Sequence, residues 1–145
     1  MDIKKTIDKA RLYYAYDVIL IAVLILIGEL GGFSGIIEPD TTTHYIVEVA
    51  SIMITIGALP VAYKILKTQM EKAATQGTEH LVKSFPRIYL PHISILVFVV
   101  YINTLLHYNG HFNGAIYCAV LACSALVYSF PTKRMLEKYI NREER

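Results

Sequence analysis

The sequence has few charged residues for its length. They make up 18% of its 145 residues, whereas apolar residues make up 54%, and the mean hydropathy is +0.43. A soluble domain of this size needs more polar surface to cover its core. The composition therefore indicates a chain that is either embedded in a membrane or strongly adhesive.

The sequence also lacks the motifs of most enzymes. Its two cysteines, Cys118 and Cys123, lie five positions apart, which on a helix is a rotation of about 500° and places the thiols on different sides. We expect no disulfide between them, and no CxxC or Cys/His zinc spacing occurs. A nucleophile motif, a phosphate loop and a dinucleotide fingerprint are absent as well. An enzyme is thus the least favoured class; no cofactor and no nucleic acid partner are predicted.

What the sequence does contain is four long apolar segments. A bilayer takes about 20 helical residues to cross, and runs such as VILIAVLILI and ISILVFVV are apolar all round, unlike a helix of a soluble bundle. We predict an all-α integral membrane protein, a single domain over residues 1–145 that forms a four-transmembrane-helix bundle in the lipid bilayer. The predicted spans are 14–33, 45–66, 88–106 and 114–130.

All the basic residues lie on one side of this arrangement. The fourteen Lys and Arg residues precede the first span, separate the second from the third, or follow the fourth. The other two loops carry Glu38, Asp40, His44, His107 and His111 instead. By the positive-inside rule both termini, the loop 67–87 and the tail 131–145 are cytoplasmic. We expect the membrane to be a bacterial inner membrane.

The cytoplasmic segments are predicted to be short helical extensions. The stretch KTQMEKAATQ favours a polar continuation of the second helix that Gly77 ends, and Pro86 suits the first turn of the third helix. The tail TKRMLEKYINREER has a narrow apolar side that includes Leu136 and Tyr139. It is either a helix on the inner membrane surface or a solvated charged tail.

Each predicted span has one face suited to the interior of the bundle: small or weakly polar residues form it in the first, second and fourth spans, and two histidines with Asn103 form it in the third. Small residues let helices approach closely in lipid, so we interpret these faces as packing surfaces, with a homo-oligomer or a membrane protein partner as the alternative. The faces are Glu48, Ser51, Thr55, Ala58 and Ala62; His92, Val99, Asn103 and His107; Gly114, Cys118, Ala122, Ala125 and Ser129; and the pairs Gly28/Gly32 and Gly31/Gly35 in the first span.

A polar group is predicted in the outer half of the bilayer. Its members are Glu29, Glu48, Asn103, Tyr117 and Cys118. Charged groups at this depth are costly, so they form either a ligand or ion pocket open to the outside or a network that locks the bundle. The glycines around Glu29 leave space for a buried carboxyl group that bonds to the third or second span.

Two pairs of residues that include histidine suggest a transition-metal site. His44 and Glu48 are four residues apart, and His107 and His111 have the same spacing. On a helix this spacing places both side chains on one face, where they can hold a metal ion. The Asn109-Gly110 turn signal opposes the second pair, because a helix that ends there does not present His111.

Four spans with a carboxylate in the first, Glu29, resemble the small multidrug resistance transporters. The resemblance implies a shared proton and substrate site at Glu29 alone. The chain departs from that family in its cytoplasmic extensions and its one-sided basic residues, since an antiparallel dimer of one chain needs little charge bias. We do not assign the chain to it. Disulfide-forming quinone reductases, which also have four spans, need the CxxC-type thiols that are absent.

Three functions are compatible with these features. The prediction we favour is a non-enzymatic membrane accessory or assembly protein that works through its packing faces. The alternatives are a transporter or channel for a proton, cation or small solute that uses Glu29 and Glu48, and a metal-dependent membrane enzyme that uses the histidine pairs.

Overall fold

Five α-helices make up the part of the chain that the structure, a computed structural model, describes. The described residues are 2–33, 41–110 and 112–143, and no strand occurs in them. The predicted all-α class is confirmed. In chain order the helices are α1 (Ile3–Glu29), α2 (Thr41–Ala74), α3 (Thr78–Gly110), α4 (Asn113–Tyr128) and α5 (Lys133–Glu143).

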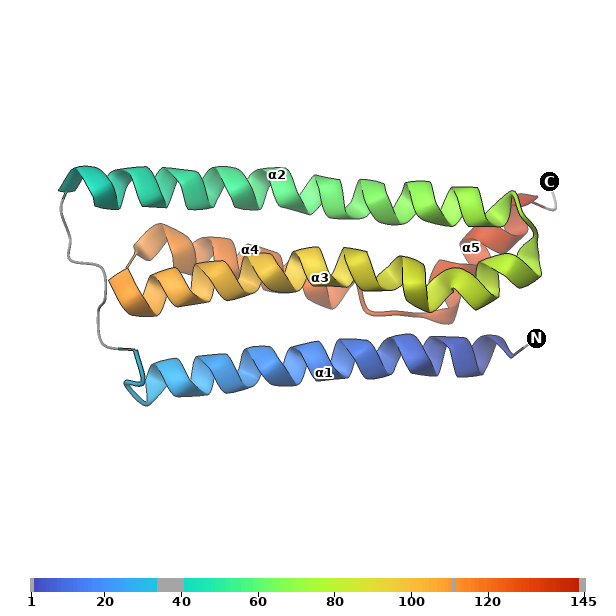
Figure 1. Ribbon diagram of the computed structural model, residues 1–145, viewed down its shortest axis with the longest axis horizontal. Helices are drawn as coiled ribbons and strands as arrows, with labels where there is room; N and C mark the ends of the chain where they lie inside the picture. Colours follow the sequence, from blue (N-terminus) through green and yellow to red (C-terminus); the bar gives the residue numbers. More distant parts are fainter. Residues whose placement is uncertain (1, 34–40, 111, 144–145) are drawn as a thin grey trace.

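The helix α3 is the centre of the molecule. It contacts α1, α2 and α4, whereas α1 contacts neither α2 nor α4 among the described residues. Half of the most apolar window of α3 is buried, against 17% for α1 and for α2. In Figure 1 α3 lies between α2 and α1, and the two chain ends, α5 and the α2–α3 turn lie together at one end. The α3–α4 connection lies at the opposite end.

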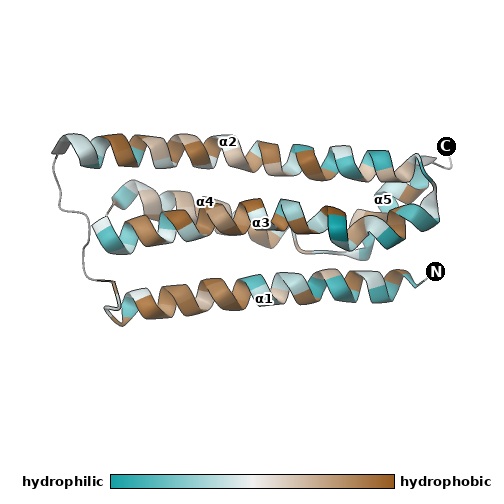
Figure 2. Ribbon diagram, viewed as in Figure 1, coloured by the Kyte–Doolittle hydropathy of each residue, from teal (hydrophilic) through white to brown (hydrophobic). Residues whose placement is uncertain are grey.

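Three helices are long and apolar enough to cross a membrane, and α4 with α5 would add a fourth span if the bent pair is counted as one. The 34 residues of α2 and the 33 of α3 correspond to about 50 Å of helix, some 20 Å more than a hydrocarbon layer of about 30 Å. The excess lies at the end with the termini, where Figure 2 shows hydrophilic residues gathered.

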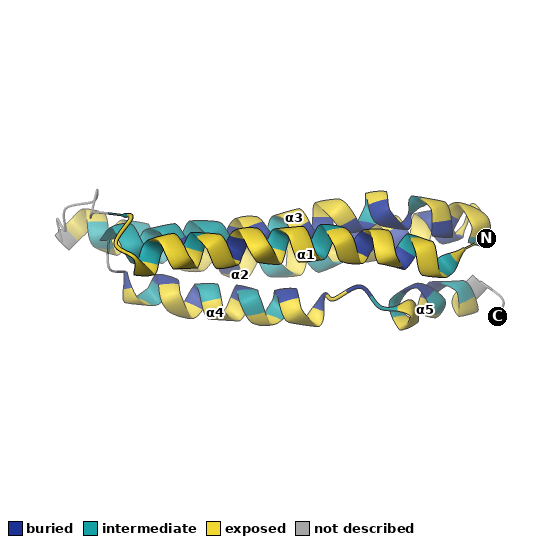
Figure 3. Cartoon of the chain, turned by 90° about the horizontal axis from the view of Figure 1, so that it is seen from below, coloured by how far each residue is buried: buried dark blue, intermediate teal, exposed yellow. Residues whose placement is uncertain are grey.

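The fourth predicted span corresponds to the short helix α4, which is followed by a bend. Figure 3 shows α4 and α5 lying against the layer that α1, α2 and α3 form. The helix α4 has 16 residues, about 24 Å of helix, and the chain bends by 64° before α5. The stretch 114–130, predicted as the fourth span, thus contains a helix shorter than most spanning helices. The structure supports three to four spans and does not by itself give the predicted number.

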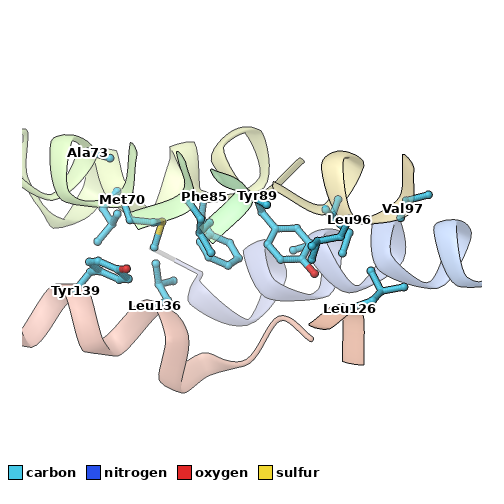
Figure 4. Packing of buried hydrophobic residues seen from close by; sticks show 14 of the residues in the cluster. Met70, Ala73, Phe85, Tyr89, Leu96, Val97, Leu126, Leu136 and Tyr139 are labelled. Carbon is cyan, nitrogen blue, oxygen red and sulfur yellow. The ribbon is translucent and has the colours of Figure 1, made fainter. Parts of the chain in front are cut away.

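The best-packed core lies at the polar end. Met70 of α2, Phe85 and Tyr89 of α3, and Leu136 of α5 are all 0% exposed and lie against one another (Figure 4). Apolar side chains are driven together where water surrounds the helices, whereas lipid provides no such force. A core of this kind is therefore expected where the helices extend beyond a bilayer.

The helix α5 packs back onto the protein. Leu136 and Tyr139 are buried in the core, and Arg142 pairs with Glu71 of α2 at 3.4 Å. Both expectations for the tail, a membrane-surface helix and a solvated segment, are therefore wrong for the apolar side of α5. That side has a protein partner because α2 and α3 extend far enough to meet it.

Two glycines end helices as left-handed residues. Gly77, with φ +106°, separates α2 from α3, and this prediction is confirmed. Gly31, with φ +76°, ends α1 in a Schellman motif, in which Gly32 N donates to the Ile27 carbonyl at 2.9 Å and Gly31 N donates to the Gly28 carbonyl at 3.1 Å.

The glycine pairs predicted as a packing face of the first span are therefore wrong. Gly31 and Gly32 follow the last residue of α1, Glu29, so Gly28 and Gly32 do not lie on one helical face. Gly35 lies outside the described residues. The helix ends earlier than predicted because the Schellman bonds satisfy its last carbonyl groups.

Pro86 lies inside α3 and does not begin it. A proline in a helix interior costs about 3 kcal/mol because it removes a hydrogen bond and crowds the preceding turn. That turn is held by packing, since Leu81, Val82 and Phe85 are all buried. The expectation that Pro86 opens the helix is wrong because tertiary contacts outweigh the local preference.

We expect Phe85→Ala to lower the free energy of unfolding by about 3–5 kcal/mol, the usual cost of removing a buried phenylalanine side chain. Phe98 lies on the same helix but is 60% exposed, so Phe98→Ala should change it by about 0.5 kcal/mol or less. Denaturant titration of the purified protein in detergent measures both. Equal effects would contradict the proposed core.

Candidate functional site

Asn103 of α3 makes the main polar contact with α2. Its amide nitrogen donates to Thr55 Oγ1 at 3.0 Å and to the Val99 carbonyl at 2.9 Å, and its oxygen accepts a bond from Ser51 Oγ. Asn103, Ser51 and Thr55 are all buried, which confirms that these predicted faces pack. The amide is thus satisfied within the bundle by two hydroxyl groups and a backbone carbonyl.

Glu48 of α2 caps the N-terminus of α4. Its Oε1 accepts a hydrogen bond of 2.8 Å from the backbone N–H of Gly114, in the first turn of a helix whose own N-cap, Phe112, makes no side-chain cap bond. A carboxylate at this position also meets the positive end of the helix dipole. A Cβ on Gly114 would lie 2.6 Å from that oxygen, so glycine permits the close approach.

Glu29 bonds to the third helix, as expected for its position. Its Oε1 accepts a hydrogen bond of 2.7 Å from the Tyr108 hydroxyl. The carboxylate is exposed, however, so the expectation of a buried group is wrong. A Cβ on Gly28 would lie 2.4 Å from the Tyr108 ring. The neighbouring glycines make room for this ring and for the end of α1.

The predicted pocket residues do not converge on one point. Glu29 lies between α1 and α3, Glu48 between α2 and α4, and Asn103 between α2 and α3. Cys118 is buried, whereas Tyr117 is 75% exposed and points away from the bundle. The described residues thus form separate interhelical contacts in place of one shared polar pocket.

The histidines at the same end make aromatic contacts. His44 stacks on Phe112 with ring centroids 4.1 Å apart, and His107 meets the edge of Tyr108 at 5.3 Å. His111 lies outside the described residues. Within residues 2–33, 41–110 and 112–143 no group of three or more His, Cys, Asp or Glu is placed to hold a metal ion.

A second polar cluster surrounds His92, which is fully buried in α3. Its Nδ1 donates to the Ala62 carbonyl of α2 at 2.9 Å, and its Nε2 lies 3.1 Å from Ser129 Oγ at the end of α4. One imidazole therefore bonds to both neighbouring helices. The sequence placed His92, Ala62 and Ser129 on packing faces but did not indicate that the three meet.

Two tyrosines complete this cluster at the C-terminal end of α4. Tyr63 donates to the Ala125 carbonyl at 3.0 Å, and Tyr89 donates to the Ser129 carbonyl at 2.8 Å. The Tyr89 hydroxyl satisfies a carbonyl group at the helix end, where carbonyls lack partners within the helix. The Ala125 carbonyl accepts from Ser129 N as well as from Tyr63. Both tyrosines lie near the cytoplasmic ends of predicted spans in the sequence, and only the structure shows that their hydroxyl groups bond to the end of α4.

An open groove separates α1 from α4. It forms because both helices pack on α3 but not on each other, and it encloses about 470 Å³, within the range of about 300–1,000 Å³ that is common for ligand sites. Its wall on α4 carries both large and small residues, namely Ile116, Ala119, Val120, Cys123, Ser124 and Val127. Glu29 and Tyr108 are also among its lining residues.

His107 lines the same groove and is not fully bonded. Its Nδ1 is buried and has no hydrogen-bond partner among the described residues. Buried polar atoms almost always have a partner, either in the protein or in a bound molecule. The groove combines open space with the polar residues Glu29, His107 and Tyr108 in its lining, and it is the candidate functional site of this chain.

Searches with protein-family models, against curated proteins and against solved structures find no match to this chain.

We expect Glu48 and Gly114 to be coupled in stability. Glu48→Ala should cost about 0.5–2 kcal/mol because the N-terminus of α4 loses its cap. Gly114→Ala adds helix propensity worth up to about 1 kcal/mol, but in the unmodified protein its methyl group displaces the carboxylate. The substitution should therefore stabilise the Glu48→Ala variant more than the unmodified protein.

A double-mutant cycle measured by unfolding in detergent tests this coupling. Ser124→Ala is a suitable control on α4, because Ser124 is exposed and, among the described residues, its hydroxyl group bonds within its own helix to the Val120 carbonyl. If Gly114→Ala changes the free energy of unfolding equally in the unmodified protein and in the Glu48→Ala variant, Glu48 does not cap α4.

Proposed function

We propose that this chain is a four-span protein of a bacterial inner membrane that acts as a non-enzymatic accessory or assembly subunit. In this proposal a transmembrane helix of a partner protein packs into the groove between α1 and α4. The observation that carries the proposal is the groove itself, an open space of about 470 Å³ whose lining includes the small residues Ala119 and Cys123.

The proposed orientation is supported by the polar end of the molecule. The basic residues of α1, of the α2–α3 region and of α5 gather at the end that also holds both termini (Figures 1 and 2). Cationic residues are retained on the cytoplasmic side of a membrane. The proposal therefore places both termini and the apolar core around Phe85 in the cytoplasm.

The walls of the groove suit a helix. Ala119 and Cys123 lie one turn apart on α4 and both line the space, which is the small-xxx-small spacing that lets two helix backbones approach in lipid. Thr104 and Ser124 line it as well and supply hydroxyl groups of the kind that bond between helices in membranes. A lipid chain needs neither feature, since exposed apolar helices are already solvated by lipid.

The polar contacts within the bundle favour this proposal over a transporter. Glu48 is engaged as a cap of α4, and Asn103 and His92 are bonded to neighbouring helices. Groups that carry a proton or cation across a membrane need to exchange partners along a hydrated path. The bonds described here are instead those of a bundle that holds one arrangement.

Thiol labelling tests the orientation. In a Cys118→Ala/Cys123→Ala background, Gln76→Cys at the α2–α3 turn and Asn113→Cys at the start of α4 each introduce one exposed thiol. In intact spheroplasts a membrane-impermeant maleimide should label Asn113→Cys at once and Gln76→Cys only after the membrane is opened. Labelling of Gln76→Cys in intact spheroplasts would contradict the proposed orientation.

Photo-cross-linking tests the groove. A benzophenone amino acid at Val120, which lines it, should give a discrete protein adduct in host membranes, whereas the same probe at Met53, an exposed residue of α2, should give none. Ala119→Phe fills the groove and should remove the adduct. Leu121→Phe, at an exposed position of the same helix, is the matched control and should retain it.

Two results would contradict the partner proposal. An adduct of twice the mass of the chain would identify a second copy as the occupant. Labelling of lipid alone, at Val120 as at Met53, would show that the groove takes no protein.

A further inference from the structure

A second hollow lies at the polar end, where α4 turns into α5. The chain bends by 64° between these helices, and a notch of about 690 Å³ opens between α2, the end of α4 and α5. Its wall on α4 carries Val127 and Tyr128, and its wall on α5 carries Arg134 and Lys138. The notch is thus apolar on one side and cationic on the other.

The two cations in the notch have no acidic partner. Arg134 and Lys138 lie one turn apart on α5, are exposed, and make no ion pair in the described part of the chain. Other cations of α5 are paired, Lys133 with Glu137 at 3.0 Å and Arg142 with a carboxylate of α2. No Asp or Glu is among the described residues that line the notch. Its charge therefore suits an anion.

The position of the notch indicates what kind of anion. Two apolar residues that line it are open to the surroundings, since Val127 is 70% exposed and Phe130 is 40% exposed. The α4 side therefore offers apolar surface to lipid chains. Tyr128 is 82% exposed, and its ring lies 6.4 Å from that of Tyr63. Exposed tyrosines are typical of the depth of lipid headgroups. A molecule that uses both walls has an anionic head and an apolar tail.

The packing of α5 explains why its cations are available. Leu136 and Tyr139 are covered by α2 and α3, so α5 cannot turn its apolar side into the bilayer as a free amphipathic helix does. Held in this way, it presents Arg134 and Lys138 toward the end of α4. Basic pockets between helices on the cytoplasmic side are suited to anionic lipid headgroups.

We propose that this notch is a binding site for an anionic phospholipid of the cytoplasmic leaflet. Arg134 and Lys138 bind the phosphate group, and an acyl chain lies along Val127 and Phe130. The proposal shares the membrane orientation inferred above but does not need the partner helix. Val127 lines both hollows, whereas Arg134 and Lys138 line the notch and are not among the described residues that line the α1–α4 groove.

Native mass spectrometry of the purified full chain with defined lipid tests the proposal. The protein should bind dioleoyl phosphatidylglycerol in preference to dioleoyl phosphatidylcholine. Arg134→Gln/Lys138→Gln should weaken phosphatidylglycerol binding by about 30-fold, given the usual contribution of two basic residues at a membrane surface. Circular dichroism and thermal unfolding of the variant establish that it folds.

The matched control is Lys67→Gln/Lys72→Gln, which removes two exposed cations from the same end of the molecule but outside the notch. It should retain binding within about threefold. An equal loss in both double variants would mean diffuse surface charge and overturn the proposal, as would equal binding of the two lipids. Displacement of the lipid by millimolar inorganic phosphate would show a free-anion site and would also overturn it.

Discussion

The face that α3 turns toward α2 and α4 is the constraint on which the other helices depend. His92 and Asn103 lie on it eleven residues apart, about three helical turns, and each is bonded to a neighbouring helix. Lipid does not drive apolar helices together, so close packing and interhelical hydrogen bonds set their arrangement, at about 0.6–1.7 kcal/mol for each bond. Two such contacts at different heights hold α2 against α3 along their length.

The two ends of the molecule are stabilised in different ways. At the end with the termini, Met70, Phe85 and Leu136 form a compact apolar core, as expected for helices in water. At the other end, polar contacts such as Glu48 with Gly114 and Glu29 with Tyr108 connect the helix ends. Both α2 and α3 take part in the contacts at both ends, because each helix is longer than the hydrocarbon layer of a bilayer is thick.

Both hollows described above follow from gaps in this packing. The α1–α4 groove exists because α1 contacts α3 without reaching α4, and the notch exists because α4 ends after 16 residues and the chain bends toward α5. Polar side chains line each hollow. In the described residues the groove includes His107, whose Nδ1 has no hydrogen-bond partner, and the notch includes Arg134 and Lys138, which form no ion pair. Function is therefore proposed at the places where the bundle is incomplete.

By itself the sequence determined that the chain is helical and apolar enough for a membrane, that Gly77 separates two helices, and that Ser51, Thr55 and Asn103 face the interior. These properties depend on composition and on a period of 3.6 residues, which are local. Only the tertiary structure decided that Glu48 caps α4, that Tyr108 lies over Gly28, and that α5 covers α2 and α3. Spacing along one helix gives the direction of a side chain around the helix axis. The residue that this side chain contacts depends on the axial shift and the rotation of the neighbouring helix, which are set by tertiary packing.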